Sequence, residues 1–190
     1  MIVLRKQAGL IPVLRTERLV LRAFTEADLD DFAAMQADPV FMRHLGVGES
    51  AGQPRTHSET WTSMAAQLGQ WALRGCGFWA IEHEGRFIGR AGILNPEGWP
   101  MPELAYGIAP AEWGRGLAFE AASAALEWAR DNLPAPLVSF IHPENRRSQL
   151  LATRLGAAQD GMIDLPGVRA QLWRYPPACG IRLALLPVGR

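Results

Sequence analysis

The chain has 190 residues, of which 48% are hydrophobic and 20% charged, and its 19 basic and 19 acidic side chains cancel to a formal net charge of zero. This length suits one domain with a sizeable core, and the balanced charge excludes a general binding surface for nucleic acid or an anionic membrane. No stretch approaches the roughly 20 apolar residues of a membrane span. The two cysteines, Cys76 and Cys179, are too few for a disulfide framework, so we expect free thiols in a reducing, cytoplasmic compartment.

Strand and helix signals alternate through the first hundred residues. Residues 1–13 show no clear period and are expected to form a loose extension. Thr25 stands three positions before Asp28 in a capping-box arrangement, which predicts a helix that Pro39 ends. The other expected elements are a strand over 19–24, a loop over 43–57, a helix over 58–73, and a hairpin of 78–82 with 86–93.

The helix expected over 58–73 carries apolar side chains at helical spacing. Its buried side is predicted to hold Trp61, Met64, Ala65, Leu68 and Trp71. Seven tryptophans are many for this length, and we expect most of them to fill the core.

Residues 103–130 join a strand, a glycine turn and a helix, and they organise the rest of the chain. The segment 104–108 is apolar and aromatic and stops before Pro110, which predicts a buried strand. An alanine-rich helix is expected from Leu117. Between them, the glycines of Trp113-Gly114-Arg115-Gly116 let the backbone approach a ligand closely. Unpaired N–H groups and the helix dipole then meet at one point, so the turn suits a phosphate or pyrophosphate.

Two nucleotide-binding patterns fail at this turn. The P-loop requires Lys followed by Ser or Thr after its second glycine, and the chain has no such run. The dinucleotide fingerprint requires a third glycine where Phe119 stands, and an acid about 20 residues further on, where the chain has Val138 and Ser139. Neither pattern explains the turn.

The remaining elements complete one α/β domain. Asn145 precedes a helix that Gly156 ends. Further strands are expected over 137–141, 159–163 and 170–175. We predict a domain over residues 14–176 with a mixed, strongly twisted sheet of six or seven strands and helices on both faces, followed by a tail over 177–190.

The segment 103–130 resembles motif A of the GNAT acetyltransferases, in the form found in the Rim-type branch that acetylates the N-termini of ribosomal proteins. The matching residues are Glu103-Leu104-Ala105-Tyr106-Gly107-Ile108, Trp113-Gly114-Arg115-Gly116-Leu117-Ala118 and Glu120-Ala121. Trp113 stands where many family members have Gln or Arg, and a Trp is common there in the Rim-type branch. The resemblance extends from about Leu14 to Tyr175 and implies the GNAT fold.

The resemblance implies that acetyl-CoA is the co-substrate. Backbone N–H groups of residues 115–118 would hold its pyrophosphate, and its pantetheine arm would lie beside the strand over 104–109, parted from the next strand by a bulge at Gly107 or Ala109. The N–H of Ile108 or Ala109 would then support the oxyanion. The implied cofactor-binding residues are Ile108, Ala109, Trp113, Gly114, Arg115, Gly116, Leu117, Ala118, Phe119, Asn145 and Ser148.

Two side chains are candidates for the proton transfers. Glu103 matches the common base position of the family, although a carboxylate at a strand end can also be merely solvated. The tyrosine that many family members use as the acid is absent, because Ala152 stands in its place. Ser148, three residues after Asn145, matches a Rim-type serine that can protonate the leaving thiolate, and a capping or packing role fits it about as well.

The resemblance thus implies an enzyme that moves an acetyl group to a primary amine, either a protein N-terminus or a small amine or amino acid, by direct attack in a ternary complex. In relatives the segments of Trp61, Trp79 and Trp99 border the acceptor groove. A non-catalytic acyl-CoA-binding or sensor module with the same fold is the alternative. The four histidines show no metal spacing, so no metal site is expected, and the protein is expected to be a monomer or homodimer.

Overall fold

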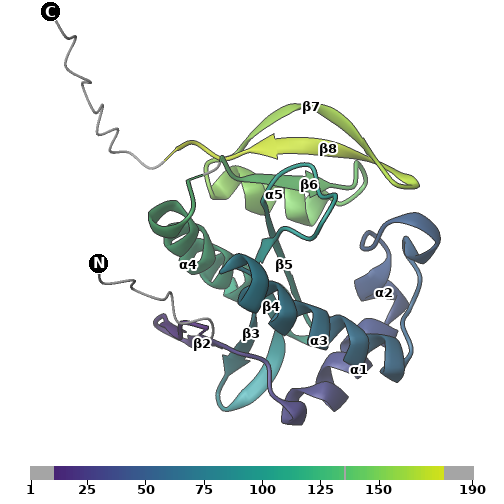
Figure 1. Cartoon of the computed structure of the whole chain (residues 1–190), viewed down its shortest axis with the longest axis vertical. Helices are drawn as coiled ribbons and strands as arrows, with labels where there is room; N and C mark the ends of the chain where they lie inside the picture. The colour runs from purple at the N-terminus through teal and green to yellow at the C-terminus, as the bar shows by residue number, and fades with distance from the viewer. Residues whose placement is uncertain (1–10, 135, 178–190) are drawn as a thin grey trace, which may run out of the picture.

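A mixed sheet with helices on both faces forms the protein (Figure 1). The computed structural model describes residues 11–134 and 136–177, so Cys179 and most of the expected extension and tail lie outside the described residues. The strands are β1 (Leu14–Arg15), β2 (Leu19–Arg22), β3 (Phe78–His83), β4 (Arg86–Leu94), β5 (Glu103–Ile108), β6 (Val138–Ile141), β7 (Ala158–Leu165) and β8 (Val168–Arg174). The helices are α1 (Leu29–Ala37), α2 (Pro39–Met42), α3 (His57–Arg74), α4 (Leu117–Asn132) and α5 (Arg146–Arg154).

The sheet opens between two of its central strands. Its order is β1-β2-β3-β4-β5-β6-β8-β7, and all neighbours run antiparallel except the parallel pair β5 and β6. The two-residue β1, which the sequence pattern does not predict, brings the described strands to eight rather than six or seven. β5 and β6 share a single register pair, Glu103 with Val138, and part beyond it. The edges that face each other across this opening are therefore free to meet a ligand.

Side chains of β5 alternate between two hydrophobic cores. Leu104 and Ile108 belong to a core that α4 fills with small side chains, including Ala121 and Ala125. Ala105 packs against a second core, formed with α1, α2 and α3. Because alanines let a helix approach a sheet closely, α4 packs tightly on β4 and β5. The predicted arrangement of helices on both faces is confirmed (Figure 1).

α1 ends before Pro39, as predicted, and a further short helix, α2, follows at once, capped by Asp38 with Pro39 at its first position. On α3, Trp61 is 49% exposed and Ala65 is also exposed, so the predicted buried side is wrong at these positions. The prediction is confirmed at Met64 and Trp71, and the other buried positions of α3 are Thr60, Gln67 and Gln70.

Gln70 shows why a polar side chain replaces an apolar one on α3. Its amide group donates to the carbonyls of Cys76 and Ile93 at 2.9 and 2.8 Å, and its oxygen accepts from Asn95 N–H at 3.0 Å. A buried polar group is stable when its hydrogen bonds are satisfied. Gln70 therefore fixes the loop after α3 to the end of β4.

Tryptophans do fill the core, as expected. Trp71, Trp79 and Trp128 meet edge to face, with ring centroids between 4.7 and 5.3 Å apart. Trp79 has no exposed surface, and its indole N–H donates to the Pro12 carbonyl at 2.7 Å. Its burial in the α4 core excludes Trp79 from the wall of an acceptor groove.

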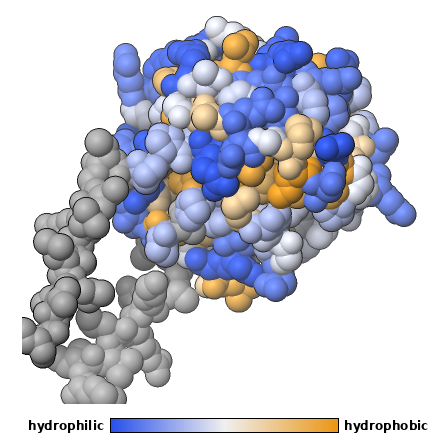
Figure 2. All heavy atoms as spheres, turned by 90° about the horizontal axis from the view of Figure 1, so that it is seen from above, coloured by the Kyte–Doolittle hydropathy of each residue, from blue (hydrophilic) through white to orange (hydrophobic). Residues whose placement is uncertain are grey.

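The surface is mostly polar on the face drawn in Figure 2, where hydrophobic side chains gather only in small patches. Within the described part of the chain, no helix combines the length and apolar character required to cross a membrane.

Candidate functional site

The turn before α4 presents a run of free backbone N–H groups. Gly114 and Gly116 both have φ of +80°, a conformation that glycine adopts without steric cost. Trp113 N–H bonds to the Pro110 carbonyl, and Glu120 N–H bonds to the Gly116 carbonyl. Between these two bonds, none of the N–H groups of residues 114–119 has a hydrogen-bond partner among the described residues. Six consecutive donors without a partner among the described residues therefore lie at the positive end of the α4 dipole.

Glu120 holds this turn in place. Its carboxylate accepts from Thr16 Oγ1 at 2.6 Å, from Arg18 N–H at 2.9 Å and from the Arg18 guanidinium at 2.7 Å. Partial burial raises the pKa of Glu120, but the bonds from Thr16 and Arg18 outweigh it and leave the pKa below its usual value. Arg18 also donates to the Arg115 carbonyl at 3.0 Å. The start of the domain thus braces the turn from behind while its N–H groups face outward.

Arginines and aromatic rings surround the turn. The Arg147 guanidinium lies 4.2 Å from the centre of the Trp113 ring, and Arg154 lies 4.4 Å from that of Phe119, so α5 stands directly beside the start of α4. Trp113 Nε1–H donates to the Ile108 carbonyl at 2.8 Å, which ties the turn to the end of β5. Arg115 pairs with Glu112 and is half exposed.

The end of β5 differs from prediction in two ways. The register with β4 is continuous from Glu103 to Ile108, so the expected bulge at Gly107 or Ala109 is wrong, and β5 parts from β6 without one. Ala109 N–H donates to the Ile88 carbonyl at 2.8 Å and is not free. Since hydrogen-bonding directions alternate along an antiparallel strand, the N–H groups of Tyr106 and Ile108 point away from β4 into the opening.

On the other side of the opening, Asn145 and Ser148 begin α5. Asn145 is the N-cap, and its side-chain oxygen accepts from Ser148 N–H at 3.2 Å. The Ser148 hydroxyl forms no hydrogen bond within the described residues, so the predicted capping role belongs to Asn145 and not to Ser148. The pantetheine contact of Asn145 and the acid role of Ser148 stay predictions.

Tyr106, which sequence reasoning treats only as part of a strand, connects β5 to α5. Its hydroxyl donates to the Ser148 carbonyl at 3.2 Å. Burial, together with the charge of Glu103 and the neighbouring Tyr175, raises the pKa of Tyr106 well above its usual value, so the phenol stays protonated. Tyr175 and Leu104 are linked in turn through Ser139 Oγ, at 3.0 and 2.5 Å. Tyr106 is therefore a candidate positioning residue for Ser148.

Glu103 lies buried at the point where β5 and β6 meet. Only 7% of its surface is exposed. Its carboxylate accepts from Trp99 Nε1–H at 3.0 Å and from Phe140 N–H at 3.3 Å. Burial raises the pKa of Glu103 to about 7, against these two bonds and the charge of Arg90, which lower it. The alternative of a solvated strand-end carboxylate is therefore excluded, and of the three tryptophans named for the acceptor groove, Trp99 is the one bonded to Glu103.

Arg90 lies on the same face of the sheet, on β4. Its guanidinium stacks 4.6 Å from the centre of the Phe78 ring and 5.6 Å from that of Phe32. Burial lowers the pKa of Arg90 to about 10, the charge of Arg55 lowers it further, and that of Glu103 raises it. No signal in the sequence sets this arginine apart, because it sits in an ordinary strand pattern.

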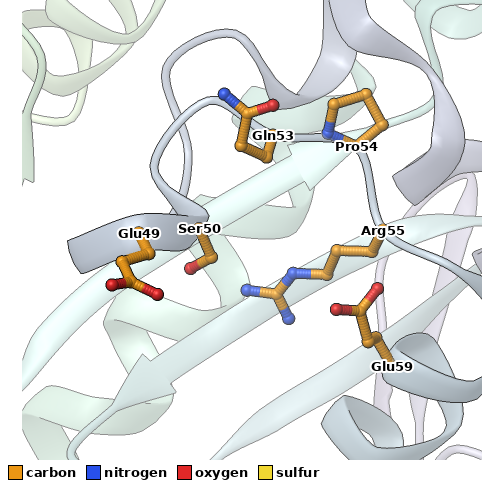
Figure 3. Close-up of a pocket in the computed structure, with 6 residues that line it drawn as sticks. All are labelled: Glu49, Ser50, Gln53, Pro54, Arg55 and Glu59. Atoms are coloured by element: carbon orange, nitrogen blue, oxygen red, sulfur yellow. The ribbon is translucent and has the colours of Figure 1, made fainter.

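Arg55 lines a cavity of about 420 Å³ that opens above the sheet. Figure 3 shows its side chain extending between Ser50 and Glu59, with strands of the sheet behind it. Gln53, Pro54 and Glu49 complete the lining. The Glu59 carboxylate is engaged in the cap of α3, where it accepts from Thr56 N–H and Oγ1 at 2.8 and 2.7 Å.

Two histidines far apart in sequence meet beside the opening. His44, just after α2, stacks on His142, just after β6, with ring centroids 4.8 Å apart, and Glu144 lies close enough to complete a group of three. Glu144 N–H donates to His142 Nδ1 at 3.2 Å, so a neutral His142 carries its proton on Nε2. The spacing rule overlooked this pair because the fold, not the sequence, brings it together.

Comparisons with known proteins agree with this geometry. Residues 18–158 match the family described as the acetyltransferase (GNAT) domain. An acetyltransferase from Agrobacterium tumefaciens strain C58 is 32% identical, with 90% of this chain and 98% of that chain covered and a TM-score of 0.77. RimL, a ribosomal L7/L12 alpha-N-protein acetyltransferase solved with coenzyme A, is 14% identical (87% and 98% covered, TM-score 0.72). Mycobacterium smegmatis RimJ, solved with a CoA disulfide, is 20% identical (82% and 80%, 0.67). These last two share the fold.

Proposed function

Because the chain belongs to the GNAT family of acetyltransferases, we propose that it moves the acetyl group of acetyl-CoA to a primary amine by direct attack in a ternary complex. One observation carries the proposal: six consecutive N–H groups over residues 114–119 lack partners within the described structure, and they lie beside the opening between β5 and β6. A diphosphate at the turn and a peptide-like arm in the opening would satisfy both sets of free backbone groups.

The thioester would then be held by the edge of β5. The N–H groups of Tyr106 and Ile108 point into the opening, and the pantetheine amides can pair with them as a strand would. A donor that faces the thioester oxygen stabilises the negative charge that develops there during attack. We assign this role to Ile108 N–H, and we leave Ala109 out because its N–H is occupied.

Glu103 would accept the proton that the attacking amine loses. An N-terminal amine has a pKa near 8, so a base helps to supply its neutral form at neutral pH. With its pKa raised to about 7 by burial, Glu103 is matched to this task better than an ordinary carboxylate. Glu103 and Ile108 stand at opposite ends of β5, so the proton passes from the amine to Glu103 through bridging waters and leaves an amide and a coenzyme A thiolate.

The thiolate must in turn be protonated. The Ser148 hydroxyl has no hydrogen-bond partner in the described part of the chain, and Ser148 stands on the first turn of α5, across the opening from β5. We assign to it the donation of a proton or hydrogen bond to the sulfur, with Tyr106 fixing its place through the Ser148 carbonyl. Ser148→Ala should then lower turnover without weakening coenzyme A binding.

The acceptor would approach from the side of α2 and α3. The loop between β7 and β8 crosses to this side, where Gly48 N–H bonds to the Pro166 carbonyl at 2.7 Å. The acceptor would be a protein N-terminus, as for RimL, a ribosomal L7/L12 alpha-N-protein acetyltransferase, or an amino acid.

Thiol release from acetyl-CoA, measured against a panel of free amino acids and peptides, tests the proposal, with mass spectrometry to locate the acetyl group. We expect acetylation of the α-amino group of at least one class. Tight coenzyme A binding without turnover of any amine would instead favour the non-catalytic sensor. If the protein neither binds coenzyme A nor acetylates any amine, the proposal is contradicted outright.

A further inference from the structure

Arg90 is a charged side chain that the fold holds among aromatic rings without an acidic partner. It forms no hydrogen bond or ion pair with any described residue, although it stacks on Phe78 and Phe32. Arg90 is partly buried, and the π-faces compensate only part of the cost of removing its guanidinium from some of its water. A structural arginine of this kind usually has a carboxylate beside it, as Arg22 has in Asp28 at 2.8 Å and Glu82 at 2.7 Å. Arg90 therefore has five N–H donors available for a ligand.

A second arginine adds positive charge near Arg90. Arg55 likewise has no side-chain hydrogen bond among the described residues, and its charge acts on Arg90. Its backbone N–H donates to the Gln36 carbonyl at 2.9 Å. Gln36 is completely buried, and neither atom of its side-chain amide has a partner in the described structure. It lies one helical turn beyond Phe32 on α1, so both face the region of Arg90.

Arg90 lies close to the place where the proposed acceptor would sit. Arg90 is paired across the strands with Gly107, the residue before Ile108, whose N–H we assign to the thioester oxygen. Glu103 lies on the same face of β5 as Gly107, and its charge also acts on Arg90. An amine that attacks the thioester with Glu103 as its base therefore brings the rest of the acceptor over Arg90.

We propose that the acceptor amine carries a carboxylate a few bonds from its nitrogen, and that Arg90, assisted by Arg55, binds this carboxylate. The inference rests on the proposed function and names the substrate class within it. Planar guanidinium groups bind carboxylates through two parallel hydrogen bonds, which fixes orientation as well as affinity. The chemistry is shared by the α-carboxylate of a free amino acid and by an acidic side chain near a peptide N-terminus.

Matched acceptor pairs test the proposal. In one arm, free amino acids are compared with their amides; in the other, amidated pentapeptides with Asp or Glu at the second or third residue are compared with their Asn or Gln counterparts. The measured quantity is the ratio of kcat/KM for the charged and neutral member of each pair. Because both members use the same base and the same coenzyme A site, effects on Glu103 cancel in this ratio. The arm with the larger ratio identifies the source of the carboxylate.

The variants are Arg90→Gln, Arg90→Lys and Arg55→Gln, with Arg86→Gln as the matched control. Arg86 is an exposed arginine on the same strand and changes the net charge equally. We expect wild type to prefer the charged member by about tenfold or more, Arg90→Gln to bring the ratio close to one, and Arg90→Lys to restore it in part. Arg55→Gln should lower the ratio less, and Arg86→Gln should leave it unchanged. Coenzyme A affinity of each variant reports that it is folded.

A wild-type ratio near one in both arms overturns the inference. If neutral amines are still acetylated in that case, the proposed function stands. An equal loss of the ratio in Arg90→Gln and Arg86→Gln also overturns the inference, because long-range charge would then explain the preference. The inference is also overturned if Arg90→Gln changes the pH profile of kcat but keeps the ratio of charged to neutral acceptors. Arg90 would then act on Glu103 and not on the acceptor. No transfer to any amine would contradict the proposed function and the inference together.

Discussion

The two sides of the opening between β5 and β6 are built on different principles. On the side of α4, the proposed cofactor site consists of backbone N–H groups over residues 114–119 that a local strand, turn and helix hold in place. On the side of α1 and α3, the proposed acceptor site consists of side chains, namely Glu103, Arg90 and Arg55, from three separate segments. The first can bind any ligand with a diphosphate, whereas the second depends on each side chain and can change its specificity by single substitutions.

This difference also explains what the sequence could predict. The glycine turn and α4 are local, so the spacing of Gly114 and Gly116 between an apolar strand and an alanine helix was sufficient to place them. Glu103 was found because it begins the same strand. Arg90, Tyr106 and the His44–His142 pair were missed, because their surroundings come from elements distant in sequence. The buried Gln67 and Gln70 misled the helix pattern for the same reason.

The error at Gly107 and Ala109 has a physical cause as well. The family resemblance implied that a bulge parts β5 from β6, and its placement at Gly107 or Ala109 was an interpretation of the sequence. The structure parts them by ending the parallel ladder after one pair, while β5 keeps regular pairing with β4. Periodicity describes one strand at a time and carries no information on where two strands diverge.

The largest loss of activity is expected from a substitution on the acceptor side of the opening. Glu103→Gln should lower kcat at pH 7 by about 10²- to 10⁴-fold, because it removes the proposed base. It should leave the Kd for coenzyme A nearly unchanged, since the turn before α4 does not contact Glu103. The kcat of wild type should fall as pH drops through about 7, and this limb should vanish in the variant.

Glu97→Gln is a suitable control for this experiment, because Glu97 is exposed in the loop before β5 and pairs only with Arg74 in the described structure. An equal loss of kcat and of coenzyme A affinity in Glu103→Gln would show that Glu103 has a structural role and not a basic one.

The burial of Glu103 should also make the free energy of unfolding depend on pH. Its folded-state pKa is raised from 4.5 to about 7, so folding favours the protonated form. The stability that this provides is fully present below pH 4.5 and is lost as pH rises through 7, at a cost on the order of 3 kcal/mol. Wild type should therefore lose more free energy of unfolding between pH 5 and pH 8.5 than Glu103→Gln does, as measured by denaturant titration.

At each pH, the free energy of unfolding of Glu103→Gln is subtracted from that of wild type. This difference isolates Glu103, because the other carboxylates titrate equally in both proteins. Parallel pH curves for wild type and Glu103→Gln would mean that Glu103 is ionised throughout this range, and its assignment as a base matched to neutral pH would be withdrawn.

The cofactor side can be altered through Gly114. Gly114→Ala places a Cβ at φ +80° with no atom within 4 Å, so the cost is backbone strain of about 1–2 kcal/mol and not a clash. The turn should relax and misalign its N–H groups, which should weaken coenzyme A binding about tenfold with a smaller change in kcat at saturation. Calorimetric titration with coenzyme A measures this.

Gly161→Ala is the matched control, because Gly161 in β7 has φ +92° and equally open surroundings but lies outside the proposed site. Equal losses of coenzyme A affinity in the two variants would indicate a general loss of stability instead of a local effect on the turn.

The smallest effect is expected at Tyr106. Tyr106→Phe keeps the ring in the core and removes one hydrogen bond to the Ser148 carbonyl, worth about 1 kcal/mol. We expect kcat to fall by a few-fold and the Kd for coenzyme A to change little. If Ser148→Ala is combined with Tyr106→Phe, the double variant should resemble Ser148→Ala alone, since Tyr106 acts through Ser148. Additive losses of kcat would assign Tyr106 an independent role.

The most direct test of the account is to observe the backbone amides themselves. In ¹⁵N-labelled protein, titration with coenzyme A should shift the amide signals of residues 114–119 most strongly, and pantetheine, which lacks the diphosphate, should shift those of Tyr106 and Ile108 while leaving 114–119 nearly unmoved. Coenzyme A that binds with its largest shifts elsewhere, and with the amides of 114–119 unchanged, would contradict the proposed cofactor site.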